Sequence, residues 1–155
     1  MTTVKPSKNS SGRSLPKKSY FIGSSKSQLF SYLFTMVSAA LLTTYIELWF
    51  IGQGYYNFHA RPFPAVFPVD IRFTLIVIPL FSLFALWIMK ALNGWTRFGF
   101  IFLTGLLAML LEPMIEEAGW IAFSSDWKHI YSFFGYSSFL LLIRLIHVLV
   151  NRLFE

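Results

Sequence analysis

The sequence predicts an all-α protein, a polytopic transmembrane bundle of four helices. Hydrophobic residues make up 55% of the chain and charged residues only 13%, whereas soluble domains carry about 25% charged residues. A helix needs about 20 mostly apolar residues to span a bilayer, and the chain contains four such stretches. Cysteine is absent, which excludes a disulfide framework and a thiolate metal site.

Residues 1–27 differ in composition from the rest. They hold six basic and no acidic residues, with many Ser, Gly and Pro. Such a segment cannot bury enough apolar surface to fold alone, which predicts a disordered cytoplasmic tail. We expect it to be solvated or held against anionic lipid, where each Lys or Arg contributes about 1 kcal/mol. Nothing in it resembles a base-reading fold, so no nucleic-acid partner is expected.

The transmembrane domain is expected over residues 28–155. Its first apolar run is much longer than the roughly 7–15 residues of a secretory signal core, which predicts an uncleaved helix. Pro79 is expected to kink the second helix. That helix carries no polar stripe between Thr74 and Lys90, so we expect it to be the most lipid-exposed. Consecutive helices are expected to pack as two hairpins, with predicted bounds of 28–51, 71–90, 98–121 and 134–153.

Lys and Arg residues near the helix ends predict the orientation. With a cytoplasmic N-terminus, nine basic residues lie inside: Lys5, Lys8, Arg13, Lys17, Lys18, Lys26, Lys90, Arg97 and Arg152. Three lie outside, Arg61, Arg72 and Lys128, while Arg144 falls within the membrane. Both termini are therefore expected to face the cytoplasm (N-in/C-in).

Several ionisable residues stand inside the apolar runs. The stretch "LLAMLLEPMIEEAGWIAF" holds Glu112, Glu116 and Glu117. At about 1.5 Å of rise per residue, Glu112 is expected about 21 Å from the inner boundary, and the Glu pair near the outer interface. Glu47 stands near the outer end of the first helix, and Arg144 roughly ten residues inward along the fourth. These residues are expected to converge in the outer half of the membrane.

Helical spacing places polar and small residues on stripes. Each stripe is expected to face the bundle interior, because a charge in lipid costs several kcal/mol, and small residues let a neighbouring helix approach closely. The stripes are Ala40, Thr43, Thr44 and Glu47; Gly105, Ala108, Glu112, Glu116 and Gly119; and Ser137, Arg144, His147 and Asn151.

Two interpretations of these charges stay open. Pairing of the glutamates with Arg144 could hold helices or partner subunits together in a non-catalytic scaffold. Alternatively, the residues form an outward-facing acidic cavity that binds or moves a proton, a cation or a small solute. Because Glu47, Glu112 and Glu116 outnumber Arg144, the second interpretation is favoured. Pro113, which has no N–H, is expected to free a backbone carbonyl beside Glu112.

Two loops are expected at the outer face. Loop 52–70 contains Arg61 among prolines and aromatic residues, and is expected to cap the outer cavity or to form an ordinary aromatic belt. Loop 122–133 brings Trp127, His129 and Tyr131 to the same face. The three histidines of the chain are scattered without metal-ligand spacing, so neither a metal nor a cofactor is expected.

Catalytic motifs are weak. Glu116-Glu117 and His147-x-x-x-Asn151 resemble two elements of CAAX-type intramembrane proteases, but Ile121 replaces the expected basic or aromatic residue and the Phe-x-x-x-His element is missing. No HExxH, GxSxG or phosphate-binding loop is present, so no enzyme is expected. Small multidrug exporters also have four helices and a glutamate in the first. They are shorter, and their acid lies nearer mid-membrane than Glu47.

Four segments carry a resemblance to a known family: "YIELWFIGQGYY", "RPFP", "GWTRFGFIF" and "WKHIYSFFGYSSFLLLI". Over about residues 40–150 the chain resembles small, uncharacterised four-helix integral membrane proteins from endospore-forming Firmicutes. Glu47 and the acids of the third helix match acidic positions of that family. The resemblance implies a multi-pass protein of the bacterial cytoplasmic (inner) membrane and no established activity. A homo-oligomer or a membrane-protein partner stays open.

Overall fold

The computed structural model describes residues 25–154, so residues 1–24 of the predicted tail lie outside the described residues. Four helices are present, and each is long and apolar enough to cross a membrane. The predicted fold class is therefore confirmed. The elements in chain order are α1 (Ser25–Gly52), β1 (Tyr56–Phe58), η1 (Phe73–Val77), α2 (Ile78–Ala91), α3 (Gly94–Glu117), β2 (Ile121–Phe123) and α4 (Ile130–Leu153).

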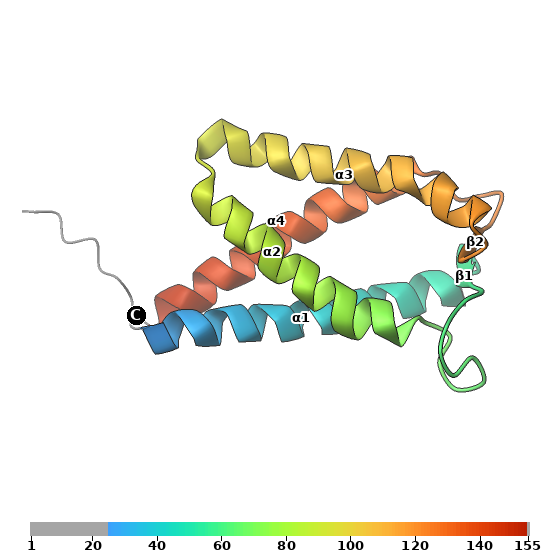
Figure 1. The fold of residues 1–155 in the computed structure, drawn as a ribbon, viewed down its shortest axis with the longest axis horizontal. Helices are drawn as coiled ribbons and strands as arrows, with labels where there is room; N and C mark the ends of the chain where they lie inside the picture. The colour runs from blue at the N-terminus through green and yellow to red at the C-terminus, as the bar shows by residue number, and fades with distance from the viewer. Residues whose placement is uncertain (1–24, 155) are drawn as a thin grey trace, which may run out of the picture.

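The two ends of the bundle differ in character (Figure 1). One end carries both strands and is called the strand end. The other carries the start of α1, the turn between α2 and α3, and the end of α4. It is called the basic end for Lys26, Lys90, Arg97 and Arg152. There the Ser31 hydroxyl donates a 3.4 Å hydrogen bond to Asn151 Oδ1, which fixes the start of α1 beside the end of α4.

The helices pack as the two expected hairpins, α1 with α2 and α3 with α4. The contact between α1 and α4 joins these hairpins, and α2 adds a smaller contact with α4. A buried core links three of the helices and the first half of α3; its members are Ala39, Ile78, Ala85, Leu86, Met89, Ile101, Leu140 and Ile143.

The expectation that the second helix is the most lipid-exposed is wrong. Of the four spans, α2 has the largest share of buried positions and α3 the smallest. The reason is that one face of α2 is buried, with Ser82, Ala85 and Met89 among its residues. The small side chains of Ser82 and Ala85 let α2 pack closely against α1 and α4. By contrast, α3 packs mainly on α4.

Gly105 marks the closest approach of α3 to α4. A Cβ added there would lie 2.7 Å from the carbonyl oxygen of Phe133 and would also collide with the Ser137 hydroxyl. Real Cβ atoms essentially never come that close to another atom. The small-residue stripe predicted on the third helix is therefore used for helix contact at this position.

Three predicted helix boundaries are displaced by four residues each. The third helix begins at Gly94 and ends at Glu117, where the expected bounds were 98 and 121. It starts with a capping box between Asn93 and Thr96. It stops because Gly119, at φ +74°, forms a C-terminal motif in which its N–H donates to the Glu116 carbonyl and the next N–H to the carbonyl of Ile115. The fourth helix begins at Ile130, four residues earlier than expected.

The two prolines inside apolar runs behave differently. Pro79 is the second residue of α2, where a proline needs no hydrogen-bond partner for its nitrogen. The irregular part of the second span is the π-helical turn Phe73–Val77, which precedes it. Pro113 lies within α3, and the helix continues past it to Glu117. Because proline has no N–H, one backbone carbonyl in the preceding turn of α3 loses its usual helical partner.

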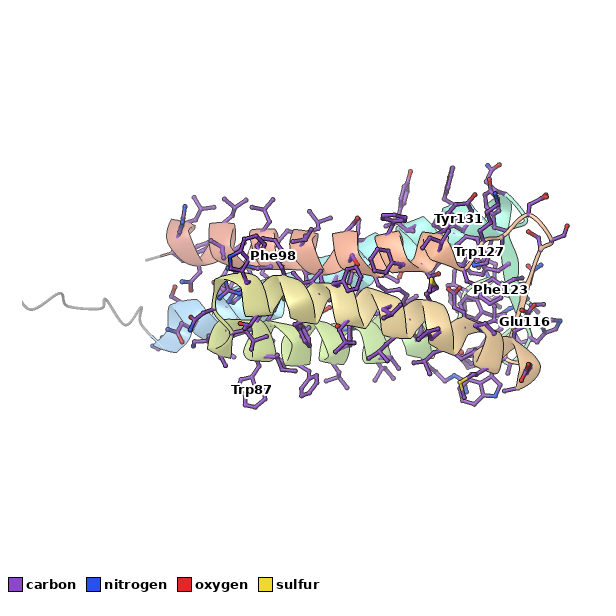
Figure 2. The ribbon with its side chains drawn as sticks, turned by 90° about the horizontal axis from the view of Figure 1, so that it is seen from above. Trp87, Phe98, Glu116, Phe123, Trp127 and Tyr131 are labelled. Atoms are coloured by element: carbon purple, nitrogen blue, oxygen red, sulfur yellow. The ribbon has the colours of Figure 1, made fainter. Side chains whose placement is uncertain are left out.

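Tryptophans are exposed near both ends of the bundle. Trp87 and Trp95 are 66% and 89% exposed near the basic end, and Trp120 is 65% exposed near the strand end. Figure 2 shows Trp87 pointing away from the bundle. Two levels of outward aromatic side chains around an apolar middle are typical of a membrane protein anchored at both interfaces.

Candidate functional site

The Glu112 carboxylate, in the penultimate turn of α3, is the centre of a polar network at the strand end. Its Oε2 accepts a 3.2 Å hydrogen bond from Trp127 Nε1 and lies 2.8 Å from His129 Nδ1. Its Oε1 accepts a hydrogen bond from the Ser132 hydroxyl. The contact with His129 becomes an ion pair when that histidine is protonated. Glu112 thus fastens α3 to the loop before α4 and to the first turn of α4.

Glu116, one turn later, binds the small sheet. Its Oε1 accepts a 3.1 Å hydrogen bond from the Phe123 N–H in β2. The strand β2 pairs antiparallel with β1, with Tyr56 opposite Phe123 and Phe58 opposite Ile121. Because β1 belongs to the loop between α1 and α2, this sheet ties the first hairpin to the second. Glu117 ends α3 and is exposed.

A set of rings, which we call the aromatic cap, surrounds Trp127 at the strand end. Figure 2 shows Phe123, Trp127 and Tyr131 gathered there near Glu116. Trp127 stacks on Phe123 with 5.6 Å between ring centroids and meets the other rings edge-on or tilted. The members are Phe50, Tyr55, Tyr56, Phe123, Trp127 and Tyr131. The predicted outer-loop residues Trp127, His129 and Tyr131 are therefore brought together.

Glu47, near the end of α1, is the most buried acid of the described residues, at 5% exposure. Its Oε2 has no hydrogen-bond partner. No Lys, Arg or His of residues 25–154 forms an ion pair with it. Burial raises the pKa of the Tyr56 phenol, and the neighbouring acidic groups of Glu47, Tyr136 and Glu112 raise it further. Tyr56, a member of the aromatic cap, therefore lies near both Glu47 and Glu112.

The loop between β1 and α2 is held by two arginines. Arg61 donates to the carbonyl oxygens of Phe67, at 2.9 Å, and of Phe58. Arg72 forms a 2.9 Å ion pair with Asp70 and donates to the carbonyl of Ala60 at 2.7 Å. Arg61, a predicted outer-loop candidate, is thus engaged with backbone. Burial by itself would raise the pKa of Asp70, but hydrogen bonds from the Arg72 side chain and backbone outweigh it and lower that pKa.

The predicted pairing of the glutamates with Arg144 is wrong. Arg144 lies twelve residues after Ser132 on α4, which is about 18 Å along the helix, and the charge that acts on it is that of Arg97. His147 lies farther still from the acids, with its ring 4.4 Å from that of Tyr32. The prediction failed for two reasons. α4 begins earlier than expected, so Arg144 and His147 lie nearer the basic end. In addition, Glu112 accepts hydrogen bonds from Trp127 and Ser132.

Sequence reasoning missed Ser132, Tyr56 and Tyr136 as neighbours of the acids. A signal was present for the first: the stretch "WKHIYS" contains three hydrogen-bond donors, Trp127, His129 and Ser132, just where α4 begins. No comparable signal marks the tyrosines, because Tyr56 lies in β1 and Tyr136 in α4, and the sequence alone does not show which of their neighbours they meet.

Two hollows of the surface are lined by apolar and aromatic side chains. One is lined by Trp95, Phe98, Phe102 and Phe133 between α3 and α4, and another by Tyr45, Trp49, Phe139 and Leu142 between α1 and α4. Neither is lined by a carboxylate, so the predicted acidic cavity is not seen at either place. Within residues 25–154 no three His, Asp or Glu side chains are grouped to hold a metal ion.

Comparison of the chain with known protein families, with curated proteins and with solved structures finds no match. The contacts at the strand end are therefore the observations that bear on function.

Proposed function

We propose that this membrane protein resides in the bacterial cytoplasmic membrane with its basic end inside, and that it binds a proton at Glu47 near the outer face. The excess of Lys and Arg at the basic end supports the orientation. A proton is the smallest of the ligands considered, and it requires no cavity beside the carboxyl group.

The buried, unpartnered oxygen of Glu47 is the observation that carries this function. An ionised carboxylate at this position would lack a cation to neutralise it, and such burial costs several kcal/mol. A carboxylic acid is neutral there and gains an O–H donor. Because Glu47 and Glu112 both lie near the Tyr56 phenol, a proton bound at Glu47 also reduces the repulsion between the two carboxylates.

The test is an infrared titration of the purified full-length protein in lipid. The wild type should show a carboxylic-acid carbonyl band at neutral pH, and Glu47→Gln should remove it. Glu117→Gln is the matched control, since Glu117 is exposed at the end of α3 and should leave the band unchanged. A wild-type protein without this band, or a band that persists in Glu47→Gln, would refute proton binding at Glu47.

Movement of the proton is a separate measurement. Proteoliposomes carrying an internal pH dye should show proton flux with the wild type and with Glu117→Gln, and none with Glu47→Gln. If the infrared band follows Glu47 but no flux is seen, the proton is bound without being moved.

A second candidate function, a membrane scaffold, is favoured by the Glu112 network. Three donors from the loop and α4 satisfy this carboxylate, as expected of a group that fastens helices. Under this function Glu112→Gln lowers thermal stability in detergent, while proteoliposomes show no flux for the wild type. A partner subunit, or a second copy of the chain, would then copurify with the native protein.

A further inference from the structure

The charges of the described residues are segregated between the two ends. The chain has seven acidic residues, and the seventh, Glu155, lies outside the described residues. The other six all belong to the strand end: Glu47, Asp70, Glu112, Glu116, Glu117 and Asp126. No described carboxylate is thus available to the arginines and lysines of the basic end.

Arg97, at the basic end, and Arg144, farther along α4 towards its middle, make different contacts. Arg97 caps the end of α2: its Nε donates to the Met89 carbonyl at 2.9 Å, and a terminal nitrogen donates to that of Leu92. Arg144 is half-buried and, among residues 25–154, donates no hydrogen bond and forms no ion pair. A guanidinium has five N–H donors in a fixed fork, so Arg144 presents unused donors beside a second positive charge.

Arg144 lies in the half of α4 that is nearer the basic end. It stands nine residues before the end of α4 at Leu153, about 14 Å along the helix. Long basic side chains at such depths extend towards the interface, where lipid phosphates lie. Lys90, in the last turn of α2, is exposed, and α2 packs directly against α4.

We propose that Arg144, together with Lys90 and Arg97, binds the phosphate of an anionic phospholipid between α2, α3 and α4 at the basic end. Arg144 supplies the forked donors that suit a phosphate. The other two residues add positive charge from the neighbouring helices. Basic pockets between transmembrane helices on the cytoplasmic side are known to hold such headgroups. This site does not depend on a proton at Glu47. It is formed by residues of the helices, and residues 1–24 are not part of it.

The test compares lipid binding to matched variants of the full chain. Phosphatidylglycerol or phosphatidylcholine is titrated into the detergent-purified protein, and the bound lipid is counted by native mass spectrometry. The wild type should prefer phosphatidylglycerol, and Arg144→Gln should weaken its binding about fivefold, as expected for one basic group at a membrane surface. Lys128→Gln removes the same charge at the strand end and should leave binding unchanged. The tail is identical in every variant, so its contribution cancels.

Two further arms keep the result decisive. Lys90→Gln alters an exposed side chain and should also weaken phosphatidylglycerol binding, which decides the matter if Arg144→Gln fails to fold. Inorganic phosphate, added in excess, should not displace the lipid. The proposal is overturned if neither variant binds phosphatidylglycerol more weakly than the wild type, if Lys128→Gln weakens binding equally, or if inorganic phosphate displaces the lipid fully and so proves to be the ligand.

Discussion

Glu112 and Trp127, fifteen residues apart in the chain, are joined by a 3.2 Å hydrogen bond from the indole Nε1 to the carboxylate. Trp127 is also the central ring of the aromatic cap. A single acid near the end of α3 is thereby linked to rings from α1, from both strands and from α4. Stability at the strand end should depend on this bond.

Glu112→Gln should lower the free energy of unfolding in detergent by about 1–3 kcal/mol, the cost of leaving a buried donor unsatisfied. Glutamine offers one acceptor oxygen to the donors of Trp127, His129 and Ser132. Trp127→Phe, which keeps a ring but removes the Nε1–H, should cost less. Glu117→Gln, at an exposed position, should change the free energy by no more than about 0.5 kcal/mol.

Double mutants distinguish this network from the pairing expected of the sequence. Glu112→Gln combined with Trp127→Phe should show a coupling energy of about 0.5–3 kcal/mol, because the two residues are in contact. Glu112→Gln combined with Arg144→Gln should be additive to within about 0.5 kcal/mol. Restored stability in the latter double mutant would mean that Glu112 and Arg144 are paired after all.

Gly105→Ala should destabilise the contact between α3 and α4 by about 1–3 kcal/mol, as overpacking does in a tight interface. The new methyl group would meet the Phe133 carbonyl, which is backbone and cannot rotate away. Gly99→Ala lies on the same helix with nothing within 4 Å of the added atom. It should be neutral or stabilising by about 0.4–1 kcal/mol. Equal thermal unfolding curves for the two variants would contradict the close approach at Gly105.

The lowered pKa of Asp70 predicts a small acid-sensitive contribution to the loop before α2. Its stabilising effect is fully present above the unfolded pKa of about 3.9 and is lost as the pH falls through the lower folded value. Arg72, the partner of Asp70 in the ion pair, is exposed to solvent, so the effect should stay below about 1 kcal/mol. Unfolding measured from pH 6 to pH 2 should show this loss in the wild type, and Asp70→Asn should lack it.

Single cysteines in this cysteine-free chain can establish the orientation. An impermeant thiol reagent applied to intact cells should label cysteines at positions 60 and 126, in the exposed loops of the strand end. It should not label those at positions 10 and 91. Position 91, exposed at the end of α2, is preferred to Gly94, whose φ of +30° would strain a cysteine. The reverse labelling pattern would place the strand end in the cytoplasm.

The helical part of the fold was predictable because membrane spans are encoded by long apolar runs. The hairpin pairing and the use of Gly105 at a helix contact were also anticipated. The end of α3 was missed although Gly119 marks it, because the apolar residues beyond it form the strand β2. The low lipid exposure of α2 was missed because no polar stripe was recognised on that helix, whereas Ser82 and Ala85 mark its inward face by their small size.

The candidate site was predictable only in part. The sequence placed Glu47, Glu112 and the residues of "WKHIYS" at the same face, and the structure brings them under the aromatic cap. Partner choice could not be read from helical stripes. A stripe shows which side of its helix a residue occupies. It does not show which residues of a neighbouring helix lie at the same depth. Arg144 shares a face with Ser137, yet it lies two turns deeper.

The pairing of β1 with β2 also bears on the order in which the protein is made. Residues 56–58 leave the ribosome long before residues 121–123, and two membrane crossings, α2 and α3, separate them. Until the third crossing is complete, β1 has an open edge and Glu47 lacks the cover that the second hairpin provides. The closing of the strand end is therefore the last assembly step at that face. A nascent chain halted after α2 would present an unpaired strand at the strand end.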